Sequence, residues 1–188
     1  AARRALRDGV RADSFEEAAA IHLEGTGLSR DQIHGVFETV GAEMVAGREW
    51  WLDNGGREAC PTGPESLADE RVLICVDGGR AKTRETKPGR PLANGYHRLD
   101  CAWTEPKLLS ITVLGEDGTI DRDVPAVIDG TMGEADALFE LLAGYLEALD
   151  IDEAAEVEVA GDGARWIWNR AGPMLGRLGV DEAHQTEG

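Results

Sequence analysis

The sequence predicts an α/β fold in which a mixed sheet follows a small all-helical region. An apolar run at 72–76 ends in an acid and two glycines, as a buried strand does when its end forms a site. Strand-like segments then follow one another, separated by turn signals. A long segment with apolar residues at every third or fourth position precedes a last strand at 157–161. The predicted order is three antiparallel strands, a helix and a fourth strand that pairs beside the first.

Length and charge limit the classes of function. A chain of 188 residues with 42% hydrophobic content suits one compact domain and a small accessory one. The net charge of -17 disfavours a nucleic-acid partner, because Lys and Arg make the contacts to phosphates. The segment 80–98, however, holds six Lys or Arg residues and one acid. One face can therefore be basic, although a merely soluble acidic surface is the alternative.

The three cysteines show no paired or zinc-binding spacing, which indicates reduced thiols in a cytosolic protein. No apolar run is long enough to cross a bilayer, and the N-terminus lacks the hydrophobic segment of a secretion signal. We therefore expect a cytoplasmic protein without membrane contact.

The first region, 1–55, is predicted to be helical. Ser14 and Ser29 each precede a Glu or Gln by three positions, the spacing of a capping box, and a short glycine-containing turn joins the two helices. The second helix could read DNA as in a helix-turn-helix, but its acidic residues favour a hairpin that packs or dimerises. Glycine and proline punctuate a predicted linker at 56–70, and the core is expected at 71–188.

The core begins with a strand at 71–77, followed by a flexible excursion at 87–94. An Asp-Gly signal at 115–118 predicts a tight turn between two strands. The first strand is expected to resume at 81–86. The other two antiparallel strands are expected at 108–114 and at 124–128.

The second half of the core changes its period. The segment 132–150 is the most regular helix, and the strand 157–161 follows it. A further helix is predicted to begin near Ala164 and to end at Gly172 and Pro173, since proline cannot continue the hydrogen-bond ladder. The tail at 178–188 is predicted to be a loop.

Two acids stand where strands end. Asp77 closes the first strand and Asp162 follows the fourth, each beside glycines that let another group approach. The element order is the one expected of an RNase H-like domain, in which these carboxylates would be adjacent. A shared Mg²⁺ or Mn²⁺ would remove their repulsion, so both are candidate catalytic and metal-binding residues. The structural alternatives are a turn at Asp77 and a helix cap at Asp162.

Three bases follow the first acid. Arg80, Lys82 and Arg84 alternate, so on a strand they share one face and could contact DNA phosphates. An edge strand protected by charge is the alternative. Glu105 and Lys107 are predicted to form an ion pair.

Three segments together resemble the DDE-type transposases of bacterial insertion sequences: Val-Asp-Gly-Gly-Arg at 76–80, Trp-Thr-Glu-Pro-Lys at 103–107 and the nine residues 161–169. The resemblance extends from about Ser14 to Gly172. It implies metal-dependent DNA cleavage and strand transfer, with Asp77 and Asp162 as the first two catalytic acids and Mg²⁺ or Mn²⁺ as cofactor. The implied partners are transposon ends, target DNA and further copies of the full-length protein.

The third acid of that family lies after the helix that follows Asp162. The tail contains Asp181, Glu182 and Glu187, but nothing in the sequence places them on an element that returns to the site. We therefore expect the chain to be a fragment that ends before its third acid, which stays unknown. The alternatives are a non-catalytic DNA-binding or dimerisation module and a metal-dependent nuclease of the same fold.

Overall fold

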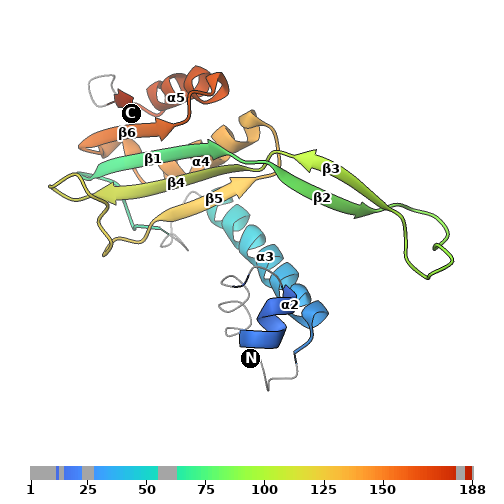
Figure 1. The fold of residues 1–188 in the computed structure, drawn as a ribbon. Helices are drawn as coiled ribbons and strands as arrows, with labels where there is room; N and C mark the ends of the chain where they lie inside the picture. Colours follow the sequence, from blue (N-terminus) through green and yellow to red (C-terminus); the bar gives the residue numbers. More distant parts are fainter. Residues whose placement is uncertain (1–11, 13–14, 23–27, 55–62, 181–184, 188) are drawn as a thin grey trace. The chain divides into compact units, whose positions relative to one another are not determined.

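A computed structural model describes residues 12, 15–22, 28–54, 63–180 and 185–187, and Figure 1 traces the chain. The chain divides into two compact units, Ala1–Asp53 and Asn54–Gly188. The capping box predicted at Ser14 lies outside the described residues. None of the helices in the described part combines the length and the apolar content that crossing a bilayer requires.

The first unit is helical. A short helix α2 (Phe15–Glu17) continues into a π-helical turn (Ala18–His22), and α3 (Arg30–Asp53) follows. The capping box predicted at Ser29 is confirmed, because Gln32 N donates to Ser29 Oγ at 3.3 Å and Ser29 N donates to Gln32 Oε1 at 2.9 Å. The side chains of Ala18 and Ile33 are fully buried, so the two helical segments share a small apolar core.

The second unit contains a mixed five-stranded sheet in the order β5-β4-β1-β6-β7. β4 runs antiparallel to both β1 and β5, whereas β6 runs parallel to β1, and β7 parallel to β6. The predicted mixed sheet, with three antiparallel strands and a fourth beside the first, is confirmed. Its strands are β1 (Arg71–Gly78), β4 (Lys107–Leu114), β5 (Val127–Thr131), β6 (Glu156–Gly161) and β7 (Gln185–Glu187).

The two faces of this sheet differ in their surroundings. On one face, alternate residues of β1 and β6 are buried, among them Val72, Ile74 and Val159. The helices α4 (Ala135–Ala148) and α5 (Arg165–Arg177) pack there, and the 3-10 turn Ile151–Glu153 leads from α4 to β6. On the other face the side chains of Leu108 and Ile128 are 51% and 73% exposed, so the sheet is asymmetric.

A separate two-stranded sheet interrupts the path from β1 to β4. β2 (Ala81–Thr86) pairs antiparallel with β3 (Leu99–Thr104), and the segment between them is the tip of a hairpin (Figure 1). The sequence predicted a strand at 81–86, but as a continuation of the first strand, and it predicted no strand at 99–104; β2 instead belongs to a second sheet. Nearly every residue of β3 is exposed, so no buried face imposes the alternation of apolar and polar residues by which strands are found.

Three predicted boundaries are wrong. β5 begins at Val127 instead of 124, because Pro125 has no N–H to give to a ladder. α5 continues through Pro173 to Arg177, since Met174 and Leu175 are buried and their packing outweighs the lost hydrogen bond. The tail, predicted to be a loop, adds the short strand β7.

We predict that Tyr145→Phe lowers the free energy of unfolding by about 1.5 to 3 kcal/mol, the usual contribution of a hydrogen bond to a charged group. The Tyr145 hydroxyl, on a side chain 3% exposed, donates to Asp129 Oδ2 at 2.8 Å and so joins α4 to β5. Urea denaturation measures the change. Tyr96→Phe is the matched control, because Tyr96 is 73% exposed, and equal losses in both variants would contradict this role.

We predict a pH effect at the turn after β4. Thr119 donates its backbone N–H and its hydroxyl to Asp117 Oδ1, and these bonds lower the pKa of Asp117 below its ordinary value. A lowered folded-state pKa stabilises the turn above the unfolded pKa, and this contribution is lost as pH falls through the folded pKa. Thr119→Val should raise the pKa of Asp117 in an NMR titration of its carboxyl carbon. An unchanged midpoint would contradict the assignment.

Candidate metal and nucleic-acid site

Asp77 lies at the carboxyl end of β1, the middle strand of the five-stranded sheet. Its neighbour Val76 is 2% exposed, whereas Asp77 is exposed. The pleat of a strand sends successive side chains to opposite faces. The carboxylate of Asp77 therefore lies on the face opposite to α4 and α5.

Asp162 lies directly beside this position. β6 is parallel to β1, with Val76 and Gly161 as Cα partners, and each partner is followed at once by an acid. Neighbouring strands are about 4.8 Å apart. A side chain on Gly161 would point towards Ile167 of α5, so the last residue of β6 faces this helix. The structure thus brings the two acids to neighbouring strand ends.

Each carboxylate accepts one hydrogen bond from the backbone that follows it. Gly78 N donates to Asp77 Oδ1 at 2.7 Å, and Ala164 N donates to Asp162 Oδ1 at 3.0 Å. The N-cap of α5 is Ala164, so Asp162 precedes the helix and does not cap it. Within the described part of the chain, neither Oδ2 atom has a hydrogen bond or an ion pair. One oxygen of each acid is available to a cation.

The carboxylate oxygens of Asp77 and Asp162 are suitable ligands for a hard divalent cation. Mg²⁺ is commonly held in proteins by one or two carboxylates, with waters and substrate phosphates completing its shell. Among the described residues, no group of three or more His, Cys, Asp or Glu side chains could hold a metal ion. Glu187, one of the acids of the tail, lies on β7 as the Cα partner of Val159. A cation at this site would therefore depend on Asp77, Asp162 and water.

A buried lysine lies at the same end of the sheet. Lys107 is the Cα partner of Gly78 and is 5% exposed. Its Nζ donates to the backbone oxygens of Glu105 and Gly133 at 3.4 and 3.3 Å, and it lies 5.9 Å from the centroid of the Trp166 ring. The predicted ion pair with Glu105 is confirmed at 3.7 Å. Lys107 thus connects β4 with the start of α4 and with α5. The one sign of this role in the sequence is a charged residue at the start of an apolar strand.

The predicted DNA-binding bases lie where the hairpin leaves the sheet. Gly79 N donates to Pro106 O at 2.9 Å and closes the base of the hairpin. Arg80 follows directly, with its guanidinium carbon 5.2 Å from the centroid of the Trp103 ring. Lys82 is exposed and is the Cα partner of Trp103, and Arg84 is the partner of Cys101. Asp77 and these bases therefore lie within a few residues of one another along the chain.

We predict that Gly161→Ala lowers the free energy of unfolding by about 1 to 3 kcal/mol, as overpacking does. The added Cβ would lie 3.1 Å from Ile167 Cδ1 and 3.2 Å from Val76 O, at the junction that positions both acids. Gly163→Ala is the matched control, because its Cβ would meet no atom within 4 Å. Urea denaturation of both variants measures the difference, and equal stability would show that this junction is not tightly packed.

Comparison of the chain with family models, with curated proteins and with solved structures found no match. No relative therefore supplies a family, a substrate or a partner for it. The proposal that follows depends on the residues of this chain and on their arrangement.

Proposed function

We propose that this chain forms the helical region and part of an RNase H-like catalytic core of a DDE-type DNA transposase. The observation that carries the proposal is the parallel pairing of β1 with β6, in which Val76 and Gly161 are partners and an acid follows each. Two acids 85 positions apart in the sequence thereby become neighbours. Both are exposed, so a substrate as large as DNA has access to them.

The topology supports an RNase H-like core. An antiparallel β1-β4-β5 meander is followed by α4 and by β6, which returns to the other side of β1. The central strand therefore has neighbours from both halves of the unit. Carboxylates at the ends of two adjacent strands of such a sheet are suited to holding one cation between them.

The residues of the site divide the proposed work. Asp77 and Asp162 would bind Mg²⁺ or Mn²⁺ through their free oxygens. A divalent cation held there would activate a water or a DNA 3′ hydroxyl and stabilise the leaving oxygen of a phosphodiester. Arg80 and Lys82, just beyond Asp77, would bind the flanking phosphates and orient the DNA backbone.

Two other functions remain distinguishable by experiment. A nuclease of the same fold would use the same acids to cut DNA but would never join strands. A non-catalytic binding or assembly module would use the helical unit, and its acids would only end strands. The free Oδ2 atoms at neighbouring strand ends favour metal chemistry over this last alternative, because acids that only end strands have no need to lie side by side.

We predict that Asp77→Asn and Asp162→Asn each weaken Mn²⁺ binding at least roughly tenfold, because each removes one of the two negative charges that would hold the cation. Isothermal titration measures the affinity. Metal binding is the primary readout, because no third acid joins the pair among the described residues. Nicking of supercoiled DNA and joining of its 3′ ends are the secondary readouts.

Asp123→Asn is the matched control. Asp123 is an exposed acid in the loop before β5, and its substitution removes the same charge. Unchanged Mn²⁺ affinity and unchanged nicking in both site variants would refute the enzymatic proposal. Nicking that depends on both acids, without any strand joining, would identify the nuclease instead.

A further inference from the structure

We propose that the hairpin 79–106, hereafter the arm, is a β-ribbon that enters the major groove of duplex DNA and contacts phosphates with Arg90 and Arg98 at its tip. This inference rests on the proposed function for the identity of the polyanion. It adds a second contact region, remote from the acids, to the bases already placed beside Asp77.

The arm has almost no core of its own. Every described side chain of β3 except Thr104 is exposed, and so is every residue of the tip, 87–98. A two-stranded hairpin alone in water is marginally stable at best. The exposed large side chains include Tyr96 and Trp103, which are 73% and 64% exposed. Such a ribbon gains from a partner that covers it.

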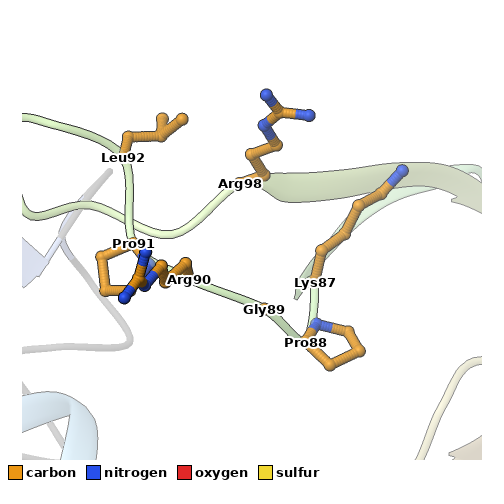
Figure 2. Close-up of a pocket in the computed structure, with 7 residues that line it drawn as sticks. All are labelled: Lys87, Pro88, Gly89, Arg90, Pro91, Leu92 and Arg98. Atoms are coloured by element: carbon orange, nitrogen blue, oxygen red, sulfur yellow. The ribbon is translucent and has the colours of Figure 1, made fainter.

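The tip has a defined shape. Lys87 N donates to Arg98 O at 2.8 Å where the strands separate, and Leu92 N donates to Tyr96 O at 2.7 Å within the loop. An open hollow of about 350 Å³ lies at the tip (Figure 2), large enough for a sugar-phosphate unit. In the view of Figure 2, the side chains of Lys87 and Arg98 extend to the same side of the loop. The hollow is lined by Lys87, Pro88, Gly89, Arg90, Pro91, Leu92 and Arg98.

The charge of the tip is suited to a polyanion. Lys87 forms an ion pair with Asp100, with 3.3 Å between Nζ and Oδ2. Among the described side chains, no acid lies within ion-pair distance of Arg90 or Arg98. The arm carries six bases and three acids in a chain of net charge -17, so a polyanion is attracted to the arm and repelled by the rest.

The form of the arm favours duplex DNA over other polyanions. The major groove of B-DNA admits a two-stranded β-ribbon, whereas the major groove of an RNA duplex is too deep and narrow for side chains to read. From Gly78 to Lys87 the chain advances nine residues, roughly 30 Å at the rise of a strand. Base pairs follow one another every 3.4 Å or so, which places the tip near phosphates about nine base pairs from the acids.

The test is the salt dependence of binding to a 24-base-pair DNA duplex, measured by fluorescence anisotropy with the whole chain. Arg90→Gln/Arg98→Gln should lower the slope of log K against log salt by about 2, one for each lost phosphate contact. Affinity at a fixed salt concentration should fall roughly tenfold or more, since each contact is a charge-assisted hydrogen bond. Arg122→Gln/Arg177→Gln removes the same charge from exposed positions outside the arm and should leave the slope unchanged.

Two outcomes would overturn the inference. One is equal slopes for the arm variant and its control. The other is an effect of the arm variant that is as large on a 24-base-pair RNA duplex or on single-stranded DNA as on the DNA duplex. Mn²⁺ titration of the same proteins separates the two proposals, because the arm variant should keep wild-type metal affinity. If the arm variant does not change DNA binding while Mn²⁺ binding depends on the two acids, only the proposed role of the arm is refuted. If Mn²⁺ binding is unchanged in Asp77→Asn and Asp162→Asn, the proposed enzyme is refuted.

Discussion

The candidate site depends on the parallel ladder between β1 and β6. Its register pairs Val76 with Gly161, and a shift by one residue would send one of the two following acids to the opposite face. The buried valines of both strands oppose such a shift, because it would also expose them. Gly161 contributes by leaving room for Ile167, so that α5 begins close to the strand end. Burial on one face therefore fixes the register in which Asp77 and Asp162 directly follow paired residues.

The residues that stabilise the sheet differ from those that could bind a cation. On the covered face, Lys107 connects β4 with the start of α4 and with Trp166 of α5, and these contacts hold the strand ends together. At the strand ends, Asp77 and Asp162 each keep one oxygen free of protein partners within the described part of the chain. A cation shared by the two carboxylates would offset any repulsion between them. The arm adds positive charge to a strongly acidic chain just beyond these acids.

The sequence predicted best those elements that have a buried face. Strands with a buried face, such as β1 and β6, and the regular helix α4 were predictable because their apolar periods reflect the core. β3 was missed because neither of its faces is buried, and the end of α5 was misplaced because tertiary packing outweighed Pro173. Asp77 and Asp162 were proposed from their glycines and strand ends, and the pairing of β1 with β6 makes them neighbours. For Lys107 the sequence predicted only an ion pair, because its contacts with Gly133 and Trp166 join segments that are distant in sequence.

The central claim is that Asp77 and Asp162 hold one cation jointly. Its most direct test is an NMR titration of ¹³C-labelled protein with substoichiometric Mn²⁺, which broadens carboxyl signals only near the bound ion. The account predicts that the side-chain signals of Asp77 and Asp162 broaden together, with a single affinity, while that of Asp123 stays sharp. Broadening of the remaining carboxylate signal with unchanged Mn²⁺ affinity in Asp77→Asn or in Asp162→Asn would contradict it, because one acid would then suffice to hold the ion.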